Sequence, residues 1–321
     1  MPERRVSVRV GNRTLSVSNL DKVLWPRDGY TKGDLIGYYE RVSGAVIPYL
    51  KGRPLTLERF PNGIDASSFF EKNIPKGMPE WVHRATLASP DGDRSKITYV
   101  VCDDMPSLVY LANLAAIVLH IWTSHVGSLD QPDFVLFDLD PGERCTTKTL
   151  TTVALALREM LTDLGVSPLV KTTGGHGLHV VVPLTAGHSY EQAKIFAELI
   201  ARRLAAECGE LVTLERMIRK RKPTAVYIDY VQVGHGKTLV TPFSVRARDK
   251  APVSWPLAWS EVRALGRSRS TDPAEAVTKF NMRTVPSALE KEGDRWSGRS
   301  WKRAKLQTVL GRARSLWRGS S

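Results

Sequence analysis

Two aspartates separated by one residue, Asp138 and Asp140, stand near the end of the apolar segment FVLFDLDP (134–141). If this segment is a strand, both carboxylates project from one face and the apolar side chains between and before them point to the other. Neighbouring carboxylates repel each other unless a positive charge lies between them, and carboxylate oxygens suit Mg²⁺ or Mn²⁺. A strand that ends in a turn capped by Asp140 explains the same pattern, so the pair alone leaves both interpretations open.

A third aspartate, Asp229, lies in an apolar setting in the segment VYIDYVQ (226–232). A lone carboxylate there costs free energy unless it is paired. Pairing with an arginine would satisfy it, and so would a three-carboxylate site formed with Asp138 and Asp140. Two metal ions roughly 3.5–4 Å apart can hold the attacking and the leaving oxygen of a phosphoryl transfer. Three aspartates on two strands therefore suggest nucleotidyl transfer or nuclease chemistry.

A glycine-rich turn in KTTGGHGLHVVVP (171–183) is suited to binding phosphate. Its glycines permit positive φ and close backbone approach, and exposed N–H groups in such a turn form an anion site. A plain tight turn with a core histidine is the alternative, because the Gly-Lys-Ser/Thr end of a P-loop and a GxGxxG pattern are both absent. The candidate residues of this turn are Thr173, Gly175, His176 and His179.

The overall charge fits a polyanionic partner. Lys and Arg total 46 and Asp and Glu total 33, which gives a net charge of +13. Such an excess favours encounters with nucleic acid or phosphate-rich ligands. The three cysteines form no CxxC pair, which argues against a disulfide scaffold, a zinc ribbon or a thioredoxin site. No apolar run reaches the roughly 18–20 residues that span a bilayer, so we expect an intracellular protein with no membrane contact.

The elements that must position these residues follow from hydrophobic spacing and capping signals. Thr31 and Asp34 predict a capped helix start, and the apolar run 106–122 predicts a mostly buried helix. The other expected elements are a hairpin around Gly11 and Asn12, a core strand over 134–141, a helix over 147–164, a strand–turn–strand over 169–184, a helix from Ser189, a hairpin joining 226–232 to 237–246, and a basic amphipathic helix near the C-terminus.

The segments FVLFDLDP, KTTGGHGLHVVVPL and VYIDYVQ, in this order and spacing, resemble the three signature motifs of the archaeo-eukaryotic primase superfamily. More closely, they are similar to the polymerase domain of bacterial ligase D and its stand-alone relatives. The resemblance covers roughly residues 10–300 and implies an α+β primase-polymerase fold, with a mixed β-sheet core flanked by helices and an N-terminal α/β module. Further matching segments are NLDKVLWP (19–26), LTLERFPNGID (55–65), FFEKNIPKGMPEWV (69–82), NLAAIVLHIW (113–122) and TPFSVRAR (241–248).

Three parts are expected along such a chain. Residues 1–105 would form an N-terminal module with DNA-contacting loops, 106–300 the catalytic core, and 301–321 a basic C-terminal helix or tail. A single compact unit over 1–300 is the alternative division.

The resemblance implies a role for each matching residue. Asp138, Asp140 and Asp229 match the acids that carry catalysis and hold the metal, two ions of Mn²⁺ or Mg²⁺. The residues that match nucleotide contacts are His120, Thr173, Gly175, His176, His179, Gln232, Arg246 and Arg248. The candidate DNA-binding residues are Lys22 and Lys32, which match lysines that hold a downstream 5′-phosphate, Phe69 and Phe70, which match an aromatic pair that stacks on bases, and Arg59.

The chain departs from the family pattern at three positions. Thr173 stands where serine is common, His176 where lysine is common, and Val233 where asparagine is common. Threonine keeps the hydroxyl, whereas His176 keeps a hydrogen-bond donor without a permanent positive charge. These changes bear on nucleotide affinity rather than on the type of reaction.

The implied function is a DNA-repair polymerase that extends a 3′-OH with ribo- or deoxyribonucleoside triphosphates. Its substrates would be 5′-phosphorylated gaps and broken ends with 3′ overhangs, in the bacterial cytosol or nucleoid. No KxDG adenylation motif and no His/Cys-rich nuclease module is present, so ligation and end trimming are expected from other chains, with a separate DNA ligase as a partner. The resemblance also implies Ku as a partner. The alternatives are a metal-dependent nuclease that uses water with the same acids, and a non-catalytic DNA-end binding or synapsis factor.

Overall fold

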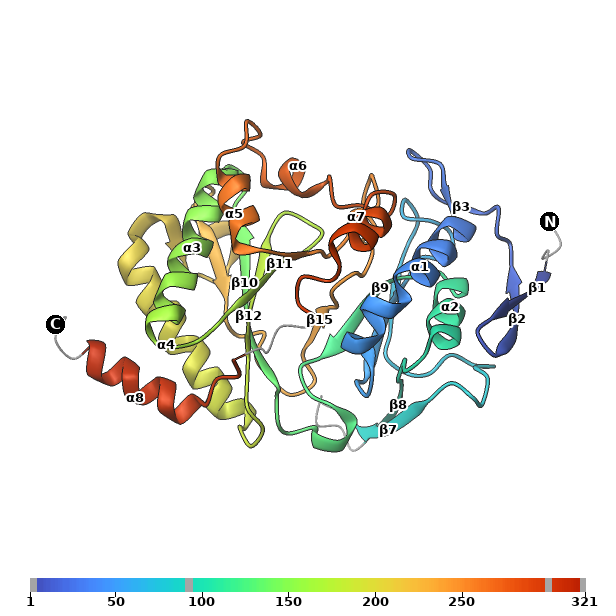
Figure 1. Ribbon diagram of the computed structural model, residues 1–321, viewed down its shortest axis with the longest axis horizontal. Helices are drawn as coiled ribbons and strands as arrows, with labels where there is room; N and C mark the ends of the chain where they lie inside the picture. The colour runs from blue at the N-terminus through green and yellow to red at the C-terminus, as the bar shows by residue number, and fades with distance from the viewer. Residues whose placement is uncertain (1–4, 90–94, 298–301, 318–321) are drawn as a thin grey trace. The chain divides into compact units, whose positions relative to one another are not determined.

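The computed structural model describes residues 5–89, 95–297 and 302–317 (Figure 1). The chain forms two compact units: the first comprises Met1–Trp122, Thr238–Trp255 and Thr278–Asp294, and the second Thr123–Lys237, Pro256–Val277 and Arg295–Ser321. Both combine helices with sheets, as the predicted α+β class requires. This division by contacts differs from the predicted boundaries at 105 and 300, because the chain twice returns to the first unit after entering the second. The predicted functional modules stay a prediction.

The first unit is organised around a sheet in the order β15-β9-β5-β8-β7, with β6 paired to β5. Figure 1 shows α1 and α2 lying together over β9. The expected hairpin at Gly11 and Asn12 is confirmed, since β1 and β2 pair antiparallel on either side of them. The elements are β1 (Arg5–Val10), β2 (Arg13–Ser18), β3 (Val23–Trp25), β4 (Tyr30–Thr31), α1 (Lys32–Leu50), β5 (Leu55–Arg59), β6 (Phe69–Glu71), β7 (Arg84–Ala88), β8 (Lys96–Val100), α2 (Met105–Asn113), β9 (Ala116–Trp122), β15 (Thr238–Val240) and α7 (Val285–Glu292).

The start of α1 is the predicted capping box. Thr31 accepts a hydrogen bond from the Asp34 backbone N–H, and the Asp34 carboxylate accepts one from the Thr31 N–H. Four N–H groups at a helix start lack partners within the helix, and this pair satisfies two donors at that end. The cap therefore sets where α1 begins, and it places Lys32 at its first position.

The apolar run 106–122 was wrongly predicted as one helix. Helix α2 ends at Asn113, Ala115 takes a positive φ of 55°, and the chain continues as β9. Buried β-branched residues such as Ile117 and Val118 favour a strand that is covered on both faces. A run of this kind shows no periodicity that separates helix from strand, which explains the error.

The second unit contains a mixed sheet in the order β13-β14-β10-β12-β11-β16. Helices α3 and α4 lie on one face of it (Figure 1), where the Phe137 and Phe196 rings meet edge-on at 6.3 Å between centroids. The elements are η1 (Val126–Ser128), β10 (Phe134–Pro141), α3 (Thr147–Asp163), β11 (Leu169–Thr172), β12 (Leu178–Pro183), α4 (Tyr190–Cys208), η2 (Gly209–Leu211), β13 (Val212–Thr213), η3 (Ile218–Lys220), β14 (Val226–Asp229), β16 (Pro256–Leu257), α5 (Trp259–Gly266), α6 (Pro273–Val277) and α8 (Leu306–Trp317).

The hairpin predicted between 226–232 and 237–246 does not form. Strand β14 pairs with β10 and β13, whereas β15 pairs with β9 in the other sheet. Because β14 places Ile228 opposite Leu139 of β10, its apolar residues are buried beside the core strand rather than against the next strand in sequence. Adjacent strands in sequence are therefore divided between two sheets.

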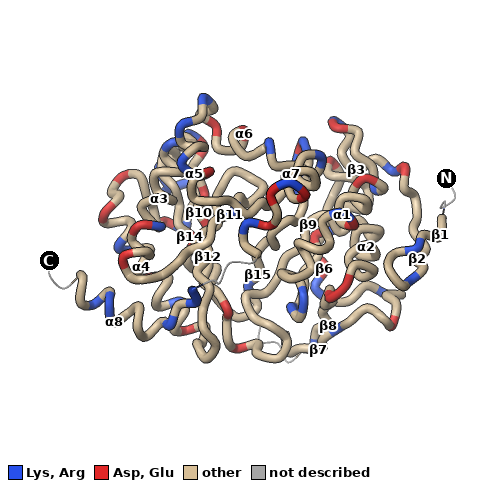
Figure 2. Tube along the Cα trace, in the orientation of Figure 1, with Lys and Arg blue, Asp and Glu red and all other residues tan. Residues whose placement is uncertain are grey.

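Charged side chains are distributed over both units, with Lys and Arg on many elements as well as on α8 (Figure 2). On α8, Leu306 and Val309 are buried, while Leu316 is 54% exposed. None of the helices in the described segments is long and apolar enough to cross a membrane.

Candidate active site and basic pocket

The strand register of the second unit brings the three aspartates together. Asp138 on β10 stands directly opposite Asp229 on β14 on one side and His179 on β12 on the other. Asp140 follows two residues along β10 and is partly exposed like Asp138, while Phe137 and Leu139 are buried. The predicted placement of both carboxylates on one face is confirmed. We call Asp138, Asp140 and Asp229 the carboxylate cluster.

Two hydrogen bonds hold the Asp229 carboxylate. The Val231 backbone N–H donates to Oδ1 at 3.2 Å, and the Gln232 side-chain amide donates to Oδ2 at 3.0 Å. Gln232 was predicted to contact nucleotide, and in this structure its amide is directed to the aspartate. It therefore fixes the orientation of one acid of the cluster.

The cluster is electrostatically unfavourable on its own. Burial raises the pKa of Asp140 to about 7, and the negative charges of Asp138 and Asp229 push it in the same direction. The positive charges of Arg221 and His176 act in the opposite direction. A cation bound among the carboxylates would remove this repulsion.

Arg221 is a site residue that the sequence analysis missed. Its guanidinium lies 3.5 Å from the centroid of the Tyr227 ring, and Tyr227 is the register partner of Asp140. The only sequence signal was the basic run RKRKP before the third motif. Lys171 was also missed: it is fully buried and stands opposite His179 in the β11–β12 pairing.

The glycine-rich turn packs against the end of β10. The Thr173 hydroxyl oxygen accepts hydrogen bonds from the Gly175 and Gly177 N–H groups at 3.1 and 3.2 Å. A Cβ on Gly177 would lie 2.4 Å from the carbonyl oxygen of Leu139, so only glycine permits this close approach. The turn can therefore lie against β10 because residue 177 is a glycine and has no side chain.

The two histidines of this turn differ in their surroundings. His179 is buried, and its Nε2 lies 3.4 Å from Asp138 Oδ1. His176 is exposed and lies close enough to Asp140 for its charge to lower the pKa of that carboxyl. His176 also lines a cavity of about 600 Å³ at the end of β10, together with Pro141, Gly142, Glu143, Arg144, Cys145, Thr146, Thr271, Asp272 and Pro273.

The donor set fits a divalent cation that prefers oxygen. Carboxylates are ligands that Mg²⁺ and Mn²⁺ use, and both burial and the neighbouring negative charges of Asp138 and Asp229 raise the pKa of Asp140. Among the described residues, no three His, Cys, Asp or Glu side chains are already arranged to hold one ion. Side-chain rotation would accompany metal binding.

In the first unit, the predicted aromatic pair lies beside His120. Strand β6 pairs with β5 so that Phe69 stands opposite Arg59, and the Arg59 guanidinium lies 5.2 Å from the Phe69 ring centroid. Phe70 is 62% exposed, and its ring meets the His120 imidazole at 5.7 Å between centroids. An exposed phenylalanine of this kind can stack on a base.

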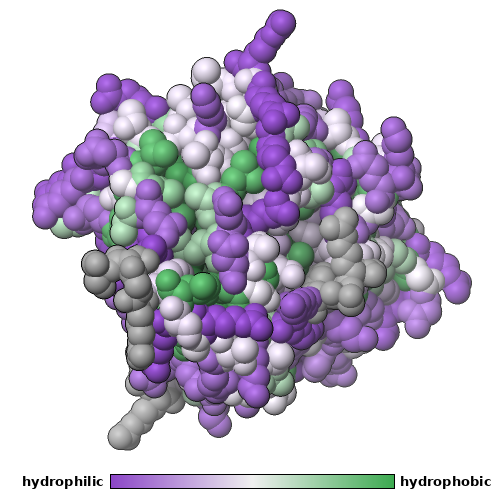
Figure 3. All heavy atoms as spheres, turned by 60° about the vertical axis from the view of Figure 1, so that its left-hand side comes forward, coloured by the Kyte–Doolittle hydropathy of each residue, from purple (hydrophilic) through white to green (hydrophobic). Residues whose placement is uncertain are grey.

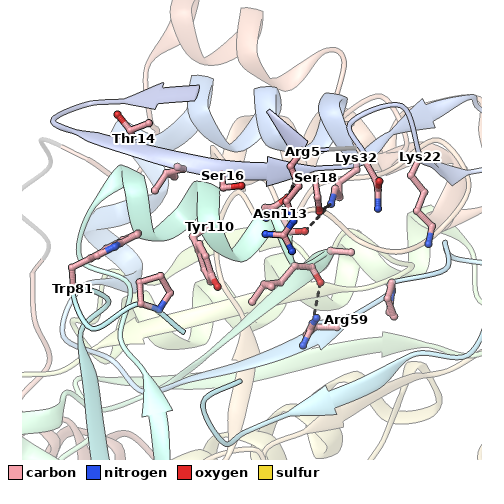
Figure 4. A pocket seen from close by; sticks show the side chains of 16 residues that line it. Arg5, Thr14, Ser16, Ser18, Lys22, Lys32, Arg59, Trp81, Tyr110 and Asn113 are labelled. Atoms are coloured by element: carbon pink, nitrogen blue, oxygen red, sulfur yellow. Dashed lines mark hydrogen bonds between the residues drawn. The ribbon is translucent and has the colours of Figure 1, made fainter. Parts of the chain in front are cut away.

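Lys22, Lys32 and Arg59 line one cavity, which we call the basic pocket (Figure 4). Its volume is about 470 Å³, and Figure 4 shows Lys22 and Lys32 at one end and Trp81 at the other. Its remaining lining residues are Arg5, Thr14, Leu15, Ser16, Ser18, Asn19, Pro61, Pro79, Trp81, Tyr110, Asn113, Leu114 and Ala115.

Both lysines of the basic pocket donate hydrogen bonds to neutral oxygens. Lys32 is only 6% exposed, and its Nζ donates to the Ser18 hydroxyl and to the Asn113 carbonyl, both at 3.1 Å. Lys22 Nζ donates to Asn62 Oδ1 at 3.0 Å. Arg59 differs, because it also forms a 2.7 Å ion pair with Glu71. The two lysines therefore add positive charge to the lining of the pocket.

Arg246 and Arg248 belong to the first unit, as does His120. The Arg246 N–H donates to the Pro252 carbonyl, and the Arg248 carbonyl accepts from the Trp25 indole N–H at 3.0 Å. The carboxylate cluster and the glycine-rich turn belong to the second unit. The nucleotide roles of these three residues stay predictions.

Comparison with known proteins indicates a nucleotidyltransferase of the primase-polymerase class. The family model described as "LigD, primase-polymerase domain" matches residues 31–296, so the chain belongs to the LigD primase-polymerase family. In the solved structures, the polymerase domain of Mycobacterium tuberculosis ligase D in complex with DNA matches with a TM-score of 0.77 and 30% identity, covering 88% of this chain and 96% of that one.

Among curated proteins, the chain is 34% identical over 288 residues to the multifunctional non-homologous end joining DNA repair protein LigD of Mycobacterium tuberculosis. It is 32% identical over 280 residues to the bifunctional non-homologous end joining protein LigD of Bacillus subtilis. Each match covers 87% of this chain but only 36% and 43% of those proteins. The chain thus spans less than half the length of the relatives it matches.

Proposed function

We propose that this chain is a DNA-repair polymerase that adds nucleotides to a 3′-OH, fills short gaps and processes broken ends. The observation that carries the proposal is the row of Asp229, Asp138 and His179 across three neighbouring strands, with Asp140 beside it. Both relatives described above carry non-homologous end joining in their names, and the similar solved structure contains DNA. These comparisons support repair of DNA ends as the setting.

The carboxylate cluster would hold two divalent ions, with Mn²⁺ or Mg²⁺ as candidates. When bound, such ions activate the 3′-oxygen and stabilise the charge that develops on the transferred phosphate. Asp138 and Asp140 would bind from one strand, and Asp229, oriented by Gln232, from the next. His179 would keep the Asp138 carboxylate in place from its other side.

The reaction is an in-line displacement. The 3′-oxygen forms a bond to the α-phosphorus while the bond to the bridging oxygen breaks, pyrophosphate leaves, and the hydroxyl proton passes to solvent. The turn at Thr173–His176 would receive the triphosphate, with the exposed His176 as a donor beside Asp140. Arg246, Arg248 and His120 are proposed to contact the nucleotide as well.

The basic pocket would bind the 5′-phosphate on the far side of a gap. Lys32 donates hydrogen bonds to the Ser18 hydroxyl and the Asn113 carbonyl, and Lys22 donates to Asn62, so both ammonium groups contribute positive charge where a phosphate would bind. Phe69 and Phe70 would stack on bases at the gap. Sealing of the filled gap is assigned to a separate ligase, with Ku as a further partner at double-strand ends.

The test is a primer-extension assay on a one-nucleotide gapped duplex with a 5′-phosphate, with Mn²⁺ or Mg²⁺ and either ribo- or deoxyribonucleoside triphosphates. We expect extension by one nucleotide with release of pyrophosphate, and a faster reaction on the 5′-phosphorylated gap than on its 5′-hydroxyl counterpart. Shortening of the primer in place of extension would indicate the nuclease. Binding without either reaction would indicate an end-binding factor.

A further inference from the structure

The segment 215–222, here called the basic loop, presents two apolar side chains among cations. Its sequence ERMIRKRK contains five Lys or Arg residues. Met217 is 40% and Ile218 77% exposed, and Ile218 is the most exposed large apolar side chain within the described segments. Isolated apolar groups are normal on a mainly hydrophilic surface such as the face in Figure 3, but an adjacent pair inside a basic segment calls for a partner.

The loop holds these side chains outward by its own hydrogen bonds. The Met217 N–H donates to Glu215 Oε1 at 2.9 Å, and the Lys220 N–H donates to the Met217 carbonyl at 2.8 Å. Arg221 folds back and donates to the Glu215 and Arg216 carbonyls at 2.8 and 3.0 Å. The apolar tip is therefore preorganised, which lowers the entropy cost of binding.

The basic loop is joined to the strand end that carries the carboxylates. After the loop, Pro223 accepts a hydrogen bond from the Arg144 N–H at 2.8 Å, and Ala225 accepts one from the Gly142 N–H at 2.9 Å. Gly142 directly follows β10, and a Cβ there would lie 2.4 Å from the Pro223 carbonyl oxygen. The residues that follow the basic loop are therefore anchored directly beside the end of β10, two residues from Asp140.

Three cations of the loop are available to bind phosphates. Lys222 pairs with Glu210, and Arg221 is occupied within the loop. Arg216, Arg219 and Lys220 are exposed, and no acidic side chain of the described residues pairs with them. Ile and Met are among the apolar residues that proteins insert against base steps, next to cations that bind the backbone.

We propose that the basic loop binds the 3′-terminal part of the strand to be extended. Arg216, Arg219 and Lys220 bind its phosphates, and Met217 and Ile218 pack against the face of an unpaired or terminal base. The identity of this strand rests on the proposed polymerase function, whereas the contact of an apolar tip with a base does not.

The experiment measures binding by fluorescence anisotropy over a range of salt concentrations. The DNA is a labelled hairpin with a four-nucleotide 3′ overhang, and a closed dumbbell duplex without ends serves as the control DNA. The variants are Met217→Ser/Ile218→Ser, Arg216→Ala/Arg219→Ala/Lys220→Ala, and Ile195→Ser. Ile195 is a matched control because it is 52% exposed on α4, among side chains of both charges.

We expect the serine variant to lose about five- to tenfold in affinity for the overhang with an unchanged salt slope, and to bind the dumbbell like the wild type. The alanine variant should lower the slope for the overhang DNA by about 2, since each of the three lost contacts with a single strand contributes about 0.7. Ile195→Ser should match the wild type.

Equal overhang affinity of the serine variant and the wild type overturns the proposal. Should the serine variant instead abolish self-association or binding to anionic vesicles, the tip serves a protein or membrane partner and the proposal is wrong. If the binding pattern appears but the wild type does not extend a primer, the polymerase function fails while the contact stands.

Discussion

Asp140, which is partly exposed, and Lys32, which is buried, are both charged side chains at predicted sites, but their surroundings differ. Asp140 lies with Asp138 and Asp229, and burial together with their negative charge raises its pKa to about 7. Lys32 donates to two uncharged oxygens, from Ser18 and Asn113. The carboxylate cluster gathers like charges, whereas the basic pocket provides neutral hydrogen-bond acceptors to Lys32.

This difference indicates how each region meets its ligand. A cluster of like charges is destabilised until a cation binds, so its geometry and its electrostatics are completed together. The basic pocket is already hydrogen-bonded and still carries net positive charge, so an anion can bind with little rearrangement. Substitutions in the cluster should therefore affect the chemical step, and substitutions in the pocket should affect substrate choice.

The largest effect is expected from neutral substitutions in the cluster. Asp138→Asn or Asp229→Asn should lower the rate of nucleotide addition by about 10³-fold or more, because each removes an anionic metal ligand. DNA affinity should stay within about twofold, since phosphate contacts elsewhere supply it. Single-turnover extension and anisotropy on the same gapped DNA measure both quantities. A variant with wild-type extension would remove that aspartate from the metal site.

The second-largest effect is expected from a substitution that displaces the glycine-rich turn. In Gly177→Ala, the new Cβ would stand 2.4 Å from the Leu139 carbonyl oxygen and would push the glycine-rich turn off β10. Because a displacement of about 1 Å can cost 10²-fold in rate, we expect a 10- to 100-fold slower extension with an intact fold by circular dichroism. Gly127→Ala is the matched control, because a Cβ there would have no heavy atom within 4 Å. Equal rates for both variants would show that the turn does not position the reactants.

Substitutions in the basic pocket should change the preference between DNA substrates rather than the rate of nucleotide addition. Lys32→Met should lower the ratio of affinities for 5′-phosphorylated and 5′-hydroxyl gaps by about tenfold, and Lys22→Ala by less, because Lys32 is more buried and charge interactions strengthen with burial. Competition binding with the two gaps gives the ratio directly. The exposed Lys51→Met serves as the control. An equal loss on both gaps would mean that Lys32 supplies only general attraction for DNA.

The strand periodicity made the cluster predictable from sequence. Alternation placed Asp138 and Asp140 on one face, and the glycine-rich turn and the capping box at Thr31 were visible as local patterns. These features depend on neighbours within a few residues, which is why they could be derived without a structure.

The errors concern partners that are distant in sequence. The run 106–122 divides into α2 and β9 because β9 is buried between β5 and β15, which no local pattern reveals. Arg221 and Lys171 escaped notice because their position at the site depends on the register of β14 with β10 and of β11 with β12. In a chain with many Lys and Arg residues, a role at the site can be assigned to one of them only from such strand pairings.

The smallest effect is expected on the thermal stability of the protein when no metal ion is bound. A folded-state pKa of about 7 for Asp140, above the ordinary value of 3.8, means that the folded protein binds this proton more tightly than the unfolded chain. The free energy of unfolding therefore falls as pH rises from about 4 to 7 and stays low above it.

Asp140→Asn removes that cost, so in chelator at pH 8 its Tm should exceed that of the wild type by a few degrees, corresponding to about 1–2 kcal/mol. The difference should shrink as pH is lowered toward 4, and Mn²⁺ should reverse the order, because only the wild type keeps all three carboxylates. Calorimetry at pH 8 and at pH 4 measures this difference in Tm between Asp140→Asn and the wild type. The exposed Asp65→Asn serves as the control. A Tm of Asp140→Asn at or below the wild-type value at pH 8 would show that the carboxylate cluster is not under electrostatic strain, and the contrast with the basic pocket would not hold.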